Sequence, residues 1–431
     1  MIIGFSTLGF ATLRNQFVLL LIVFSALFIG YLFLIKNFKF TFKKAVIIAL
    51  LFRLCFLAST PVLSDDYFRF IWDGRILSSG NNPYLILPQD LSAEELEIIN
   101  NVDLQDEVYK GLNSKQYYSV YPPINQLLFA IPAILGNNNV KLEIILLRLL
   151  IIAFEVGTFF LLFKLLKHYN QNPSKLLIYA FNPLVIVELT GNLHFEGVVL
   201  FFGLLAVWFW IRHLKILSPI ALSIAIGVKL IPLMLLPILL RKIRLSSAFL
   251  YGGTVLGLVV LYFFPFLNDK LISNFSSSID LYFRNFEFNA SIFYLVRAGG
   301  YYLVDYDIIQ KAGPILSIIV LFTIVGISLQ QKLFSKNVLE KALILLTIYY
   351  LFATTVHPWY ITTLVGLSVF VNYRYAIIWS YLVILSYSHY WNGEFQENYL
   401  LIFIEYLLLF SVILIDVWYS SKPAMNNKNE S

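Results

Sequence analysis

The stretch SDDYFRFIWDGR, residues 64–75, opens with two adjacent carboxylates, Asp65 and Asp66, and continues as a mixture of charged and aromatic residues. It directly follows the apolar run 44–60, which is long enough to cross a membrane as a helix. Ionisable side chains are costly in lipid and are retained near it mainly for function. The stretch therefore marks the point where a membrane helix ends and a polar site begins.

The composition of the chain is that of a membrane protein. Of its 431 residues, 59% are hydrophobic and 13% are charged. The net charge of +6 comes from short basic clusters between apolar runs, which argues against a nucleic-acid partner, because such partners need one basic stripe. The single cysteine, Cys55, cannot form an internal disulfide. We therefore predict an all-α polytopic membrane protein.

Apolar runs that could cross as helices recur along the whole chain. They occupy residues 17–35, 44–60, 142–163, 175–190, 196–211, 216–240, 245–264, 312–330, 339–356, 359–372, 375–390 and 398–418. Lysine and arginine near helix ends favour the cytoplasm. Basic clusters lie at residues 36–44, 164–175, 212–215, 241–244, 332–341, 374 and 422. Alternating the runs across the membrane places all of these clusters inside.

Two segments need special treatment in this topology. Basic clusters flank run 216–240 on both sides, so we predict that it enters and returns as two short helices, with a break near Lys229 and Pro232. The run from Ile124 to Leu135 is short and contains Pro132, so we predict a re-entrant or interfacial helix. The result is about 11–13 transmembrane helices, with the C-terminus inside.

The segment 61–123 is extracytoplasmic in this topology. It carries ten acidic residues against four basic ones, as expected outside the cytoplasm. Further polar groups fall on the same face: residues 192–196, Lys229, the loop around 280–297, residues 357–360 and His389. Such a concentration of polar groups is what an active site at a membrane interface needs.

These residue types suit glycosyl transfer from a lipid-phosphate donor. An enzyme that builds a glycan outside the cytoplasm cannot count on nucleotide sugars, so the sugar must arrive on a membrane lipid. Asp65 or Asp66 could accept the proton of the attacking hydroxyl. Cations and imidazoles would stabilise the departing phosphate. The candidates for this role are Arg69, Arg75, Lys229, Arg284, Arg297, His194 and His357.

Several sequence blocks occur in an order that resembles a known family. They are Asp66 to Tyr84, which ends in GNNPY, then YPP at 121–123, NP at 182–183 with Glu188, GNLHFE at 191–196, GVKLIP at 227–232 and HPWY at 357–360. Together they resemble the GT-C superfamily of glycosyltransferases. The chain is most similar to bacterial polyprenyl-phosphate-mannose-dependent mannosyltransferases of family 87, and more distantly to the catalytic subunit of GPI mannosyltransferase I.

The resemblance implies a GT-C fold with a large first extracytoplasmic catalytic loop, residues 61–123. It implies one transmembrane domain, residues 1–420, followed by a short polar cytoplasmic tail at 421–431. The expected function is transfer of a hexose, with mannose as the first choice, from a polyprenyl-phosphate donor to a lipid-linked or glycan acceptor. The expected partners are that donor, a glycan or glycolipid acceptor and membrane lipids, in the plasma (inner) membrane. The acceptor and the linkage stay open.

The resemblance also assigns roles to individual residues. Asp66 is the expected general base, and Asp65 is a neighbour that shares the role or helps to hold a divalent ion. His194 and Glu196 fall where relatives often show His-x-Asp, so the longer glutamate is a departure from the pattern. The expected substrate-binding residues are Arg69, Asp73, Arg75, Tyr84, Tyr121, Asn192, His194, Glu196, Lys229, His357 and Trp359.

No cofactor is expected. The sequence contains no Gly-rich phosphate loop, no Cys/His zinc spacing and no Ser-His-Asp hydrolase signature. An aspartate pair could hold Mg²⁺ or Mn²⁺, but two adjacent acids are a weak metal signal. We therefore expect an enzyme that works without a metal, and loss of activity in EDTA that Mn²⁺ restores would overturn this.

Other interpretations compete with each assignment. On a helix, Asp66, Arg69 and Asp73 would share one side and could simply neutralise one another. Lys229 could reach to the interface from a helix end, and HPWY could be a Pro-started helix with a belt aromatic. A transporter or flippase of a lipid-linked sugar would also use broken helices, but it usually repeats them in a second half, and no such repeat is visible. A non-catalytic scaffold gives no reason for polar residues to gather on one face.

Overall fold

The computed structural model describes residues 1–92, 94, 106–329, 338–391, 393 and 395–421. Within these ranges the regular secondary structure is helical, and the one β-type feature is an isolated bridge between Phe288 and Thr355. The prediction of an all-α chain is confirmed. The expected polar tail lies outside the described residues from position 422 onward, as do Glu95, Glu97 and Asp103 of the acidic loop.

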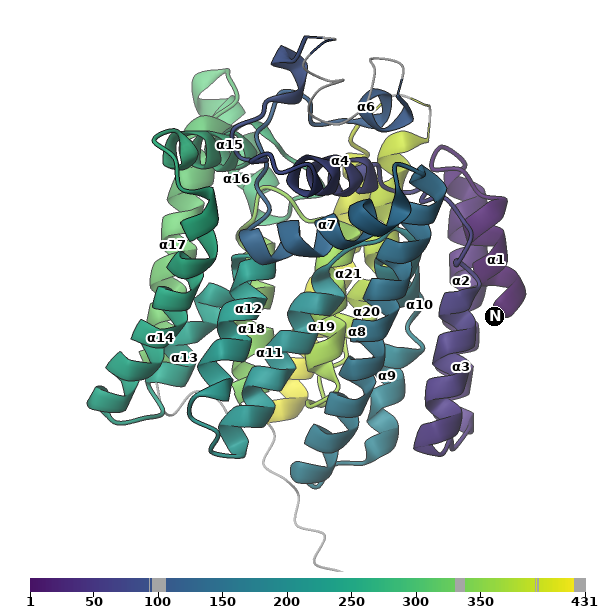
Figure 1. Cartoon of the computed structure of the whole chain (residues 1–431). Coiled ribbons are helices and arrows are strands. Elements are labelled where there is room, and N and C mark those ends of the chain that lie inside the picture. Colours follow the sequence, from purple (N-terminus) through teal and green to yellow (C-terminus); the bar gives the residue numbers. More distant parts are fainter. Residues whose placement is uncertain (93, 95–105, 330–337, 392, 394, 422–431) are drawn as a thin grey trace, which may run out of the picture.

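The helices form an upright bundle with shorter helices across its upper end (Figure 1). The α-helices are α1 Ile2–Phe10, α2 Phe17–Asn37, α3 Phe42–Leu54, α4 Asp66–Ser78, α6 Glu107–Gly111, α7 Pro123–Gly136, α8 Val140–His168, α9 Leu177–Ala180, α10 Pro183–Val185, α11 Glu196–Ile211, α12 Leu217–Val228, α13 Leu236–Leu240, α14 Leu245–Phe263, α15 Leu271–Asn285, α16 Ile292–Val304, α17 Ile309–Leu329, α18 Val338–Phe352, α19 Pro358–Ser368, α20 Tyr375–Leu382 and α21 Tyr399–Ser421. A π-helical turn, η3, spans Ile186–Gly191.

Among the described residues, five helices are long and apolar enough to cross a membrane. They are Phe17–Asn37, Val140–His168, Leu245–Phe266, Ile309–Leu329 and Tyr399–Ser420, and a bent pair, Pro183–Gly191 with Glu196–Ile211, would add a sixth. The chain is therefore a multi-pass membrane protein. The larger number of crossings that hydropathy predicts also counts shorter apolar runs, which the structure builds as short helices such as α12 and α13.

The predicted break in run 216–240 is confirmed. Helix α12 ends at Val228, Lys229 adopts an extended conformation with φ −144° and ψ 142°, and a 3₁₀ turn at Ile231–Leu235 leads into α13. Pro232 and Pro237 each stand at the start of a new helical turn. The first backbone N–H groups of a helix have no acceptor within the helix, so a proline, which has no N–H, costs no hydrogen bond there. The break places the Lys229 side chain at a helix end.

Two short helices, α4 and α7, lie across the upper ends of the upright helices (Figure 1). They pack closely because Gly74 of α4 meets the backbone of α7, where a Cβ atom would lie 2.2 Å from the Phe129 carbonyl oxygen. Helix α7 contains Pro132, as predicted for an interfacial or re-entrant segment. The connections α2–α3, α8–α9 and α11–α12, which carry basic clusters, lie at the opposite end of the bundle (Figure 1).

One sequence-based expectation needs correction. The region 280–297 was expected to be a loop, but α15 runs to Asn285 and α16 begins at Ile292. Helix α15 contains four serines and two asparagines, so no window of it is apolar enough to register as a hydrophobic run.

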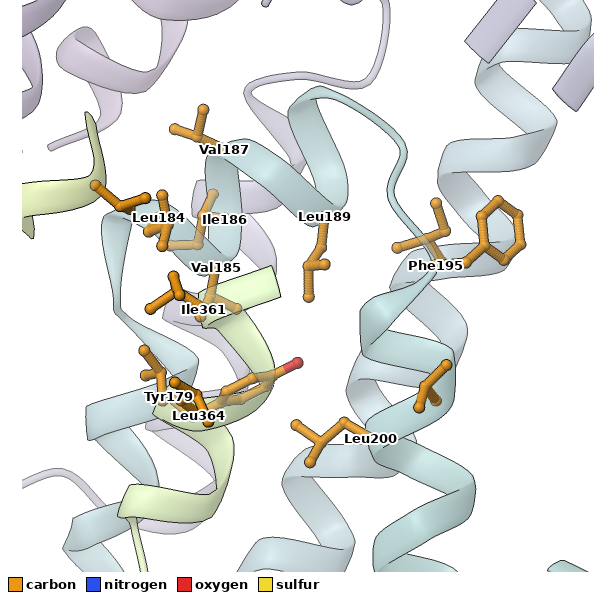
Figure 2. Packing of buried hydrophobic residues seen from close by; sticks show 14 of the residues in the cluster. Tyr179, Leu184, Val185, Ile186, Val187, Leu189, Phe195, Leu200, Ile361 and Leu364 are labelled. Carbon is orange, nitrogen blue, oxygen red and sulfur yellow. The ribbon is translucent and has the colours of Figure 1, made fainter. Parts of the chain in front are cut away.

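The segment that leads into the site rests on a dense apolar core. Tyr179, Leu184, Leu189, Ile361 and Leu364 are all buried and pack between the chain around η3 and α19 (Figure 2). Asn182 begins this segment, and its side-chain oxygen accepts hydrogen bonds from the backbone N–H groups of Leu184 and Val185. This core fixes the position of residues 186–196, from which several polar side chains of the site project.

Candidate functional site

Asp66 is the first residue of α4 and is half-buried. Its backbone N–H donates to the Ser64 hydroxyl at 3.3 Å, which orients the start of the helix. Burial raises the pKa of the Asp66 carboxyl to about 6. Lys229 opposes this rise, whereas the charges of Glu196 and Asp65 add to it. The group is thus a base whose pKa lies close to neutral pH.

An ion pair between two helix ends lies near Asp66. Glu196 begins α11, Lys229 follows the last residue of α12, and the Lys229 ammonium donates to the Glu196 carboxylate. The second oxygen of Glu196 is buried and has no hydrogen-bond partner in the described part of the chain. A bend of 111° between η3 and α11 turns the start of α11 toward the site. The Lys229 ammonium also lies 5.4 Å from the centre of the Tyr360 ring.

Three stacked rings line the same region. The centre of the His194 ring lies 3.7 Å from that of Trp359, and Trp359 lies 4.2 Å from His357 on its other side. Burial and the charge of Lys229 lower the pKa of His357 to about 3, so its imidazole is neutral at neutral pH. The Nε2 atom of His194 is buried and lacks a hydrogen-bond partner among the described residues. The stack brings the blocks at 191–196 and 357–360 together.

Asn192 has a bridging role in the structure. Its side-chain amide donates to Glu188 at 3.1 Å, and its side-chain oxygen accepts the backbone N–H of Leu63 at 3.4 Å. The Tyr387 hydroxyl holds the other oxygen of Glu188 at 2.7 Å. Asn192 thereby connects the approach to Asp66 with the π-helical turn.

The charged residues further along α4 are engaged by the protein itself. Arg69 donates to Asp73 at 2.8 Å and to the backbone carbonyls of Ser114 and Tyr117. The second oxygen of Asp73 accepts hydrogen bonds from Ser119 and Gln126. Asp66 takes no part in this pairing. Of the three residues that could have neutralised one another on α4, only Arg69 and Asp73 form an ion pair.

The remaining candidate residues on segment 61–123 also contact other parts of the protein. Arg75 donates twice to Glu143 at the start of α8, at 3.2 and 2.9 Å, and is buried. The Tyr84 hydroxyl donates to the backbone carbonyl of Tyr121 at 2.7 Å. The Tyr121 ring packs against the rings of Phe70 and Phe129 and lies close enough to Asp66 to feel its charge.

Two further cations expected at the site have partners within their own region. Arg284 forms an exposed ion pair with Asp280 one turn earlier on α15, and Arg297 pairs with Glu287.

Asp65 forms an ion pair with Arg14, which precedes α2 and was not among the candidates. No sequence signal marks Arg14, because it stands alone before the first long apolar run. In the described part of the chain, no group of three or more His, Cys, Asp and Glu side chains is arranged to hold a metal ion.

An apolar cavity opens from the Glu196–Lys229 pair. It lies between α11, α12, α13, α18 and α19, and its lining is apolar apart from Glu196, Lys229, Tyr350 and Thr363. Along α11 the lining runs from Glu196 to Val207, a helical rise of about 17 Å. The cavity is therefore long and apolar, with charged residues at one end.

Comparison with known protein families identifies a match. The family model for the N-terminal domain of alpha-(1->6)-mannopyranosyltransferase matches residues 5–243. The matched region contains Asp66, Glu196 and Lys229 and ends before His357 and Trp359. No curated protein and no solved structure matches the chain.

Proposed function

Because the chain belongs to the alpha-(1->6)-mannopyranosyltransferase family, we propose that it transfers mannose from a polyprenyl-phosphate donor to a glycan or glycolipid acceptor. The family match supports mannosyl transfer and agrees with the resemblance seen in the sequence. The reaction takes place at the extracytoplasmic face of the plasma membrane, where α4 and α7 cover the end of the bundle opposite the basic connections (Figure 1).

The apolar cavity is the observation that carries the choice of donor. A nucleotide sugar has no long apolar part that could fill an apolar channel. A polyprenyl chain does, and each CH₂ group that it buries contributes about 0.8 kcal/mol of binding free energy. The Lys229 ammonium stands at the charged end of this cavity, where the phosphate of such a donor would lie. The cavity thus fits the apolar tail, and its mouth fits the head group.

The chemistry can be assigned to residues around the mouth. The acceptor hydroxyl gives its proton to Asp66 as its oxygen forms a bond to the anomeric carbon of the sugar. The bond between that carbon and the phosphate oxygen breaks, and the electron pair leaves with the polyprenyl phosphate. Lys229 stabilises the charge that accumulates on this phosphate, and Glu196 holds the ammonium in place. The stacked rings of His194, Trp359 and His357 form one side of the space that the sugar would occupy.

Sugar transfer by the purified protein in detergent tests the function. We expect a mannosylated product from polyprenyl-phosphate-mannose and none from GDP-mannose. A transporter would give no product, because it moves its solute without forming a glycosidic bond. Transfer from GDP-mannose alone would overturn the choice of donor.

A variant that fills the cavity tests the role of the lipid tail. Gly203 lines the cavity, and a Cβ atom built on it has no atom within 4 Å, so Gly203→Phe adds a ring to open space. We expect the KM for a long-chain donor to rise about tenfold or more, since several CH₂ groups lose their burial. The KM for a donor with a ten-carbon tail should change less. The matched control is Gly257→Phe on the exposed surface of α14, where a Cβ atom also meets open space.

A further inference from the structure

Arg14 connects three parts of the chain next to the site. It lies between α1 and α2, and its Nη1 donates to the Asp65 carboxylate at 2.9 Å. Its guanidinium carbon also lies 4.4 Å from the centre of the Tyr390 ring. The Arg14 and Asp65 side chains are 30% and 35% exposed, so the pair is only partly screened by water. Arg14 is thus the immediate partner of the carboxylate that adjoins Asp66.

The pairing changes what Asp65 does at the start of α4. Asp65 occupies the N-cap position, yet its side chain accepts no capping hydrogen bond. Asp65 and Asp66 are adjacent carboxylates, and like charges at this separation oppose each other's ionisation. The guanidinium offsets the charge of Asp65 and draws its carboxylate toward the α1–α2 connection.

We propose that Arg14 is a positioning residue that keeps Asp66 ionised by neutralising Asp65 and holding it in place. The proposal rests on Asp66 being the general base of the proposed transfer. Arg14 touches no reacting atom in this account, and its influence passes through Asp65.

The surroundings of Asp66 show why a second cation matters. The titratable groups that act on it or respond to its charge come from several elements, namely Asp65, Tyr121, Glu188, Glu196, Lys229 and Tyr390. In this set, which covers only described residues, Lys229 is the one cation, and Glu196 already binds it. Burial raises the pKa of Asp66, and the charge of Asp65 raises it further. Loss of Arg14 would therefore leave Asp66 protonated at higher pH.

The pH dependence of kcat/KM for mannosyl transfer tests the proposal. We expect Arg14→Gln to move the acidic limb of the profile upward by about 0.5–1 pH unit, the size of effect that a nearby charge has on a carboxyl pKa. Arg14→Lys keeps the charge and should leave the limb near its wild-type position. The matched control, Arg284→Gln, removes a positive charge from the exposed pair on α15 and should not move the limb.

A second variant keeps the test valid if Arg14→Gln does not fold. Asp65→Asn removes the opposing charge, so its acidic limb should move to lower pH. The double variant Arg14→Gln/Asp65→Asn should lie close to wild type, because both charges of the pair are gone. Three outcomes would overturn the proposal. The acidic limb could stay in place in Arg14→Gln, it could shift upward in Asp65→Asn, or transfer could survive in Asp66→Asn but not in Asp65→Asn. Absence of transfer by the wild-type protein would instead contradict the proposed function.

Discussion

The two ends of α4 carry the same kinds of charged residue, but the carboxylates at the two ends differ in burial and in their hydrogen-bond partners. Toward the C-terminal end, Asp73 and the Arg75 partner Glu143 are fully buried, and the protein supplies partners to both oxygens of each carboxylate. At the N-terminal end, Asp66 is half-buried and lies near Glu196, one of whose carboxylate oxygens has no hydrogen-bond partner among the described residues. Carboxylates with a hydrogen-bond partner on each oxygen hold the loop in place, whereas a carboxylate oxygen without such a partner is available to a substrate.

The largest expected effect concerns the open end. Asp66→Asn removes the proposed base with almost no change in shape, so kcat should fall about 10²–10⁴-fold. Thermal unfolding in detergent should change little, because no buried partner is lost. The control is Asp90→Asn, an exposed residue of the same loop, which should keep wild-type activity. Equal kcat values for Asp66→Asn and the control would contradict the role of Asp66 as the base.

The next effect concerns the closed end. Glu143→Ala removes the buried carboxylate that accepts two hydrogen bonds from Arg75, and it leaves Asp106, 3.5 Å from Arg75, as the remaining carboxylate partner. We expect the free energy of unfolding to fall by about 3 kcal/mol. The midpoint of unfolding in detergent measures this. The double variant Arg75→Met/Glu143→Leu should recover much of the loss, since it removes both charges. If Glu143→Ala instead abolished transfer with no loss of stability, the pair would belong to the site.

The pH profile sharpens the comparison because the proposed base at the open end changes its charge within a pH range that an assay can cover. The pKa of Asp66 is raised to about 6, so the carboxylate is protonated and inactive as a base below this pH. We expect kcat/KM to fall about tenfold for each pH unit below 6 and to level off above it. An activity that is constant from pH 7 to pH 5 would show that another group accepts the proton.

The smallest effect concerns the ring stack. Trp359→Phe keeps an aromatic ring between His194 and His357 but reduces its area. We expect the KM for the donor to rise about two- to tenfold with little change in kcat, as loss of part of an aromatic contact predicts. Trp418→Phe, on an exposed part of α21, is the control. A tenfold fall in kcat at unchanged KM would indicate that Trp359 acts on the reaction step itself.

Local sequence patterns predicted much of the fold. Apolar runs located most long helices, and Gly227, Pro232 and Pro132 marked the break after α12 and the short helix α7. The order of the sequence blocks also picked out Asp66, Glu196, Lys229, His194 and Trp359, which the structure gathers around one region.

The partners of the charged residues could not be predicted in the same way. Arg75 and Glu143 are 68 residues apart, and Arg14 and Asp65 are 51 apart, so packing across the bundle decides which charges meet. Arg53 and Glu155 form a fully buried pair between α3 and α8, inside runs that were interpreted only as apolar. A lone charge within an apolar run is a signal that a partner exists, but it does not say which residue the partner is.

The location of the open end of α4 is tested most directly by labelling. In a protein with Cys55→Ser, a cysteine in place of the exposed Asp90 reports the position of the loop, and Lys215→Cys reports the α11–α12 connection. The proposed function predicts that a membrane-impermeant maleimide labels position 90 in right-side-out vesicles and position 215 only after the vesicles are opened. Labelling of position 215 alone in sealed vesicles would place Asp66 in the cytoplasm and contradict transfer at the outer face.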